Sequence, residues 1–106
     1  WSRKADFPET FRKLGFAFYA NGKLYYGGGS DQINTWDFNQ HIYQEMYEYD
    51  PETDTWKFLL SSIFARRSGA VAAGINNKGY IWGGVETDLS TFGWPTLLEF
   101  DPSFLP

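Results

Sequence analysis

Short apolar stretches separated by turn residues set the pattern of this 106-residue chain. LGFAFYA at 14–20 and GAVAAGI at 69–75 mix apolar with small residues, which suits strands that are buried on both faces. Each stretch runs into an asparagine turn, Asn21-Gly22 or Asn76-Asn77, whose residues readily adopt the positive φ angles of a two-residue hairpin. We therefore predict two innermost strands, each folding back at once into a second strand.

The second strand of each half runs into glycines. These strands are KLYYGGG at 23–29 and KGYIWGG at 78–84. We expect the pairs Gly28-Gly29 and Gly83-Gly84 to end the strands where bulky side chains would crowd a neighbouring sheet.

Two further strands complete the unit. MYEYDP at 46–51 and TLLEFDP at 96–102 predict a third strand in each half. The turn DPETDT at 50–55 leads into WKFLLSS at 56–62, which reads as a fourth, outermost strand. The pattern predicts an all-β fold built from four-stranded meanders.

The two halves of the chain are copies of each other. A shift of 55 residues aligns the first part of the repeat, and a shift of 51 aligns EYDP at 48–51 with EFDP at 99–102. The first shift superimposes Trp1 on Trp56, Arg12 on Arg67, Asn21 on Asn76, Lys23 on Lys78, Tyr25 on Tyr80, and Gly28-Gly29 on Gly83-Gly84. The repeats cover about 1–55 and 56–106.

The double glycine, the spaced tyrosine and tryptophan and the period of about 50 residues resemble a kelch repeat, twice over the whole chain. WSRKADFPETFR followed by NGKLYYGGG is most similar to the bacterial six-bladed branch, which includes N-acetylneuraminate epimerase-like proteins. The resemblance implies a β-propeller with two four-stranded kelch blades per chain, expected to form part of a six-bladed ring.

The spacing of aspartate and tryptophan suggests how such a ring would close. Asp50 precedes Trp56 by six positions, whereas Asp101 has no tryptophan after it and Trp1 opens the sequence. We expect the N-terminal segment 1–7 to close onto a C-terminal segment as the outer strand of one blade, with Trp1 in the place of Trp56. The partner would be a flanking copy in a longer chain or, as our first choice, the chain itself in a homotrimer of six blades.

Charge and composition narrow the possible partners. The net charge of −4 and the pI near 4.8 disfavour nucleic acid and anionic membrane surfaces. The chain has no cysteine, which excludes disulfides and thiolate metal sites. No apolar run approaches the roughly 20 residues of a membrane span. We expect a soluble protein of unknown compartment, cytoplasmic if it is a designed protein made recombinantly.

Arg12 and Arg67, which precede the two innermost strands, are candidate ligand-binding residues. In the resembled family this position often points toward the channel mouth, where arginine can bind a carboxylate. The alternative is that each arginine pairs with an acidic neighbour such as Glu48 or Glu99.

Two long segments, 30–46 and 85–95, carry further candidates for ligand binding: Trp36, His41 and Trp94. Aromatic residues there could form a platform for a sugar or a peptide, or they could fold back over strand edges. We weigh these two interpretations equally.

Catalytic and metal-binding patterns are weak. His41 is the only histidine, the serines have no nucleophile motif, and the carboxylates of 31–37 do not match a calcium loop. We therefore predict no enzyme activity, no metal and no cofactor, with sialic-acid epimerase-like activity as a minority alternative.

Three hypotheses of function remain open. The first is a non-enzymatic, self-assembling propeller unit, a structural scaffold that is engineered or symmetrised. The second is an excerpt of a protein-binding or peptide-binding kelch module. The third is a fragment of a bacterial carbohydrate-active six-bladed kelch protein.

Overall fold

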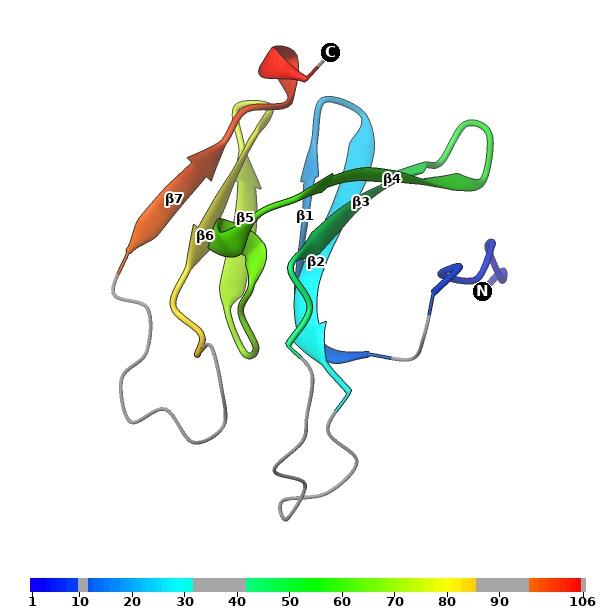
Figure 1. Cartoon of the computed structure of the whole chain (residues 1–106). Helices are drawn as coiled ribbons and strands as arrows, with labels where there is room; N and C mark the ends of the chain where they lie inside the picture. The colour runs from blue at the N-terminus through cyan, green and yellow to red at the C-terminus, as the bar shows by residue number, and fades with distance from the viewer. Residues whose placement is uncertain (10–11, 32–41, 86–95, 106) are drawn as a thin grey trace.

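The computed structural model describes residues 1–9, 12–31, 42–85 and 96–105. Two antiparallel sheets stand side by side in it (Figure 1). The first sheet, here called blade 1, contains β1 (Lys13–Ala20), β2 (Lys23–Ser30), β3 (Glu45–Asp50) and β4 (Thr55–Ser61) in that order. This sheet confirms the predicted four-stranded meander.

The second sheet, blade 2, contains β5 (Val71–Ile75), β6 (Lys78–Trp82) and β7 (Leu97–Phe100) in chain order. The short 3-10 helix η1 (Ile63–Ala65) connects the blades, and η2 (Pro102–Phe104) follows β7. Among the described residues blade 2 has three strands, and residues 1–9 form none. The closing strand from segment 1–7 therefore stays a prediction.

The hairpin turns form as the asparagines predict. Asn21 and Gly22 have φ angles of 52° and 79°, and Asn76 and Asn77 have φ angles of 53° and 63°. These left-handed values at both central residues are those of a type I′ hairpin turn, which matches the twist of the flanking strands. Local sequence therefore fixes the register of β1 with β2 and of β5 with β6.

The double glycines differ between the blades. In blade 2 the strand β6 stops at Trp82, directly before Gly83-Gly84, as predicted. In blade 1 the expectation was wrong, because β2 continues through Gly28 and Gly29 to Ser30. A Cβ on Gly28 would lie 2.5 Å from the carbonyl oxygen of Arg67, so the next blade does require a residue without a side chain here.

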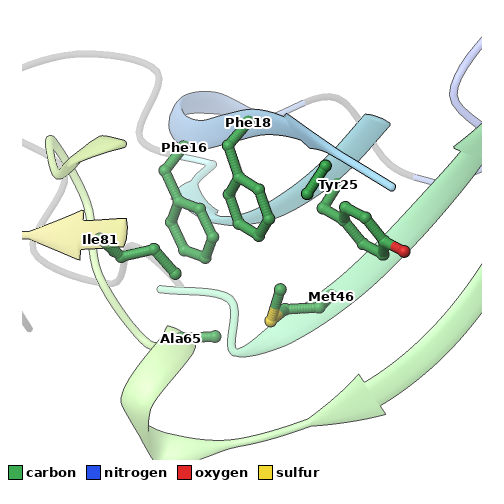
Figure 2. Packing of buried hydrophobic residues seen from close by; sticks show 7 residues of the cluster. Phe16, Phe18, Tyr25, Met46, Ala65 and Ile81 are labelled. Atoms are coloured by element: carbon green, nitrogen blue, oxygen red, sulfur yellow. The ribbon is translucent and has the colours of Figure 1, made fainter. Parts of the chain in front are cut away.

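The core lies between the blades. It contains mostly residues of blade 1 on the face toward blade 2, together with one residue of η1 and one of β6 (Figure 2). These are Phe16, Phe18, Ala20, Tyr25, Met46, Ala65 and Ile81. Blade 2 comes close because its inner strands are small there, and a Cβ on Gly74 or Gly79 would collide with Tyr19 or Phe18 of β1.

Each blade also carries the same ionic clamp across its second and third strands. The ammonium group of Lys23 lies 3.8 Å from Glu48 and 4.0 Å from Asp50. The equivalent Lys78 lies 3.5 Å from Glu99 and 3.9 Å from Asp101. The repeat thus preserves cross-strand pairing as well as strand order.

No helix in the described residues is both long and apolar enough to cross a lipid bilayer.

Candidate functional site

The two arginines that precede the inner strands are the candidate site residues for which the structure gives most detail. Arg67 is fully buried where the blades meet. Its Nε donates to the carbonyl of Phe64 at 2.8 Å, Nη1 to the carbonyl of Gly83 at 3.0 Å, and Nη2 to the hydroxyl of Thr96 at 2.9 Å. Burial lowers the pKa of the Arg67 guanidinium from its ordinary value.

The backbone of Arg67 also holds the blades together. Its carbonyl accepts a hydrogen bond of 2.8 Å from the N–H of Gly29 in blade 1. A second such bond joins the N–H of Gly69 to the carbonyl of Leu14 at 2.9 Å. Arg67 therefore ties η1, β6 and the start of β7 to the double glycine of the other blade.

Arg12 occupies the equivalent position on the far side of blade 1. Its side chain is only 5% exposed, and its guanidinium lies 3.9 Å from the carboxylate of Glu45. The guanidinium also packs 3.7 Å from the ring centre of Tyr43, with Phe7 and Tyr47 slightly farther away. Its Nε and Nη1 atoms are buried and make no hydrogen bond.

The repeat explains both similarities and differences between the two arginine sites. A shift of 51 places Thr96 on Glu45, so each arginine faces the first residue of its third strand or the residue beside it. Arg12 pairs with the acidic residue Glu45, whereas Glu48 was the example named from the sequence. Glu99, the example named for Arg67, contacts Lys78 and Tyr80. Because both side chains are buried between layers, their observed contacts are structural. The hypothesis that they bind a ligand carboxylate stays a prediction.

Cavities lie at both sides of blade 1. A mainly apolar cavity of about 420 Å³ lies between the outer parts of the two blades. Residues of β4, η1 and β7 line it, among them Leu60, Phe64, Leu98 and Phe100. A smaller one of about 260 Å³ lies beside Arg12, between Phe7, Glu9, Tyr26 and Trp56. Among the described residues, Glu99 is the charged residue that lines the larger cavity, and Glu9 and Arg12 are those that line the smaller one.

Trp56 and the N-terminal segment pack together on the far side of blade 1. The indole N–H of Trp56 donates to the carbonyl of Ala5 at 2.9 Å, and its ring lies 5.3 Å from the ring of Phe7. The carboxylate of Asp54 accepts bonds from the N–H of Ala5 and the hydroxyl of Tyr49. The bond from Tyr49 is the main cause that lowers the pKa of Asp54.

The remaining predicted residues are the two aspartates of the turns, Trp1, and the candidates in the two long segments. Asp50 and Asp101 cap the turns after the third strands, accepting from the N–H groups of Glu52 and Ser103. Trp1 is fully exposed. Trp36, His41 and Trp94 lie outside the described residues, and the sugar platform stays a prediction. Within the described ranges no group of three or more potential ligands could hold a metal.

Sequence reasoning missed the aromatic cluster around Phe7 and the partner of Arg12. Phe7 contacts Tyr26 and Tyr47 edge to face, at 5.1 and 4.8 Å between ring centres. Nothing in the local pattern of 1–9 indicates this packing. The partner Glu45 was open to prediction, because the 51-residue shift aligns it with Thr96, whose hydroxyl accepts a hydrogen bond from Arg67.

Comparison with known proteins gives relatives but no family model, since no model matches the chain. N-acetylneuraminate epimerase from Yersinia enterocolitica is 29% identical over 102 residues, which cover 88% of this chain and 26% of that protein. The enzyme of the same name from Escherichia coli K12 is 29% identical over 89 residues, covering 84% of this chain and 24% of that protein. The chain therefore spans about a quarter of the length of these relatives.

A solved structure shares the fold. The structure of YjhT, a β-propeller, superimposes with a TM-score of 0.78 and 24% identity, covering 97% of this chain and 39% of that one. The relatives agree with the third hypothesis, a piece of a bacterial kelch propeller, and the comparisons give no support to an engineered origin. The chain thus has the fold of a β-propeller segment and is similar in sequence to bacterial N-acetylneuraminate epimerases.

Proposed function

We propose that this chain forms part of the wall of a propeller that acts on a sugar acid of the N-acetylneuraminate class. The observation that carries the proposal is the 29% identity to N-acetylneuraminate epimerase over 88% of the chain. The shared propeller fold supports it, since a propeller ring surrounds a central channel where the inner strands and loops of several blades meet. A fold alone would not indicate a substrate.

In this proposal the described residues mainly provide the scaffold. Arg67 is fully buried, and its side-chain donors hold Phe64, Gly83 and Thr96 in place. Its backbone carbonyl accepts from the N–H of Gly29 in blade 1, and this bond links the two blades. Epimerisation inverts a stereocentre and needs groups that move protons. The sequence-based candidates for contact with the sugar are Trp36, His41 and Trp94, with His41 the only histidine of the chain.

The test is a direct assay. The whole propeller that contains this chain is added to freshly dissolved N-acetylneuraminate, and the approach of the sugar's anomers to equilibrium is followed by one-dimensional proton NMR against a buffer control. We expect a faster, saturable approach to equilibrium and its loss in His41→Ala, with Lys57→Ala on the exposed β4 as matched surface control. An unchanged rate, together with no shift of the melting temperature by millimolar sugar, would overturn the proposal.

A further inference from the structure

The chain leaves strand β6 through Gly83 and enters strand β7 from Thr96. The last pair of the ladder between these strands joins Trp82 to Leu97. In an antiparallel register the next pair is Gly83 and Thr96, because residue numbers rise along one strand as they fall along the other. The ladder does not continue to this pair. Another contact must therefore hold these two residues at a fixed spacing.

The side chain of Arg67 provides this contact. Its Nη1 donates to the carbonyl of Gly83 at 3.0 Å, and its Nη2 donates to the hydroxyl of Thr96 at 2.9 Å. We call this arrangement the arginine bridge. Both donor atoms belong to one rigid planar group, so the bridge fixes the spacing of its two acceptors much as a ladder pair would.

The guanidinium group is itself held firmly. Its Nε donates to the carbonyl of Phe64 in η1 at 2.8 Å, and Arg67 is 0% exposed. The neighbouring backbone is bonded as well, since Ser68 and Val85 exchange two hydrogen bonds of 2.9 and 3.0 Å. A buried side chain with several well-formed hydrogen bonds is restricted to one conformation. The arginine bridge is therefore a rigid support for the ends of β6 and β7.

The burial of Arg67 bears on the kind of role that it can have. An arginine that recognises a ligand directly must present N–H groups to that ligand. In this structure the side chain of Arg67 has no exposed surface, and three of its donors bind protein atoms. Arg67 can thus influence a bound ligand through the residues that it holds in place.

Blade 1 has the equivalent residues at the same point of its sheet. The last ladder pair of β2 with β3 is Gly27 with Met46, so the next pair is Gly28 with Glu45. The shifts of 55 and 51 align these two residues with Gly83 and Thr96, and they align Arg12 with Arg67. The repeat therefore places one arginine beside this position in each blade.

The contact is looser in blade 1. The guanidinium of Arg12 lies 3.9 Å from the carboxylate of Glu45, and its Nη1 makes no hydrogen bond. The N–H of Tyr43 donates to the carbonyl of Gly29 at 2.9 Å, so backbone bonding joins the two sides of this end of blade 1. In residues 42–85 and 96–105, the bonds that join the end of β6 to the start of β7 come from Arg67. Arg67 is therefore the better candidate for a role in positioning.

The arginine bridge stands where the sequence indicates contact with a sugar. Trp94, a sequence-based candidate for that contact, precedes Thr96 by two positions. The hairpin turns lie at the opposite end of the molecule from the bridge (Figure 1). A change remote from the chemistry that misplaces a group by about 1 Å can lower a rate by about a hundredfold. The spacing of Gly83 and Thr96 is thus able to affect function.

We propose that Arg67 is a positioning residue for the sugar: together with Thr96 it fixes the ends of β6 and β7, and it improves sugar binding without touching the sugar. This inference rests on the proposed function. It adds a described residue of blade 2 to that function and names the contact through which the residue acts.

The experiment uses the whole propeller that contains this chain, with N-acetylneuraminate as the probe in the anomer assay. Thr96→Val removes the acceptor hydroxyl and nearly keeps the shape of the side chain, whereas Thr96→Ser keeps the hydroxyl. We expect Thr96→Val to raise KM by about tenfold, the factor for one lost hydrogen bond to a charged group, and to leave kcat unchanged. Thr96→Ser should have the KM of the wild type.

Two further variants complete the series. Arg67→Lys keeps the positive charge but lacks the fork that reaches both acceptors, so it should raise KM at least as much as Thr96→Val does. Thr55→Val is the matched control, because Thr55 is an exposed threonine of β4 whose hydroxyl is also hydrogen-bonded, to Thr53 at 2.6 Å. This control should leave both KM and kcat unchanged.

Hydrogen exchange followed by mass spectrometry separates positioning from a general loss of folding. In Thr96→Val, exchange at the amide of Val85, beside the bridge, should become about tenfold faster, whereas exchange in the hairpin 75–78 should not change. Faster exchange in both regions, or a lower kcat with an unchanged KM, would mean that folded protein is lost and would overturn the proposal. An active propeller in which Thr96→Val has the KM of the wild type would overturn it too.

The same measurements distinguish this inference from the proposed function. A wild-type propeller that does not act on the sugar overturns the proposed function, and with it the role of Arg67 in sugar binding. The exchange of Val85 then still decides whether the arginine bridge fixes the strand ends. An active wild type with an unaffected Thr96→Val variant overturns the inference alone.

Discussion

Blades 1 and 2 carry the same repeat but bury it differently. Phe16 and Met46 of blade 1 are 2% and 3% exposed, whereas their equivalents in blade 2, Val71 and Leu97, are 58% and 67% exposed. Strand order, hairpin turns and the lysine clamp are the same in both blades. The turns and strand pairings, which depend on residues close in the sequence, are thus repeated in both blades. The burial of the apolar face, which depends on a neighbouring blade, is not repeated.

This difference shows where the stability of the chain comes from. A single blade gains its hydrogen bonds by itself, but its apolar face is removed from water only when the next blade covers it. Blade 1 has this cover from β5, β6 and η1. Substitutions at equivalent positions should therefore have unequal costs, and four pairs of variants test this expectation.

The largest difference is expected for Phe16→Ala and Val71→Ala. Phe16 is buried and fills the space above Gly27, so its truncation leaves a cavity and should cost about 3–5 kcal/mol of unfolding free energy. Val71 is exposed in a single copy, so Val71→Ala should cost less than about 0.5 kcal/mol when the chain is monomeric. Urea denaturation followed by circular dichroism measures both. Equal costs would mean that the two blade faces have the same environment.

The next difference concerns the two arginines. Arg67→Met removes the donors to the carbonyls of Phe64 and Gly83 in a buried site and should cost on the order of 2–4 kcal/mol. Arg12→Met removes one long ion pair and aromatic contacts, and should cost about 1–2 kcal/mol. Denaturation of both variants is the measurement. A larger loss in Arg12→Met would contradict the expectation that the fully hydrogen-bonded Arg67 contributes more to stability than Arg12 does.

The fold was largely predictable from sequence because its determinants are local. Asparagine and glycine at the turns, the apolar strand pattern and the two repeat shifts predict all seven strands of the described residues and their order. The extent of β2 was not predicted, since double glycine normally interrupts a strand. Here Gly28 still pairs with Gly15, and the N–H of Gly29 donates to the carbonyl of Arg67, which is a contact between residues distant in the sequence.

The candidate site was less predictable for the same physical reason. The repeat indicated that Arg12 and Arg67 have equivalent roles, either in binding a ligand or in an ion pair. The sequence around a buried arginine and around one that faces a channel can be the same, so it did not distinguish these roles. Their partners are set by inter-blade packing, as with Gly83 and Thr96 around Arg67. The repeat was the usable signal, because it aligns Thr96 with Glu45.

A smaller effect is expected at the inner strands. Gly74→Ala places a Cβ against the carbonyl of Tyr19 and should cost about 1–3 kcal/mol, because β5 must move away from β1. Tyr19→Ala changes the equivalent, 63% exposed residue of blade 1 and should cost less than about 0.5 kcal/mol in a monomer. Thermal melting of both variants distinguishes these outcomes. A neutral Gly74→Ala would rule out the close approach of the blades at this point.

The smallest effect is the alkaline titration of two equivalent tyrosines. Burial first, and then the nearby Glu48, raise the pKa of Tyr25 to about 12, while a hydrogen bond to Glu99 is the main cause that raises the pKa of Tyr80. Because the folded state favours the neutral phenol of Tyr25, the contribution of Tyr25 to the free energy of unfolding is complete below the ordinary pKa of 10.0. This contribution is lost as the pH rises toward about 12.

At pH 11 the free energy of unfolding should have fallen by about 1 kcal/mol. In a monomer, Tyr25→Phe should make the fall of stability between pH 10 and 12 shallower, whereas Tyr80→Phe should change it less, since Tyr80 is only partly buried. Urea titrations across this pH range measure the slopes, and absorbance at 295 nm follows the ionisation itself. A steeper dependence on Tyr80 than on Tyr25 would contradict the idea that cover by a neighbouring blade distinguishes the two halves of the repeat.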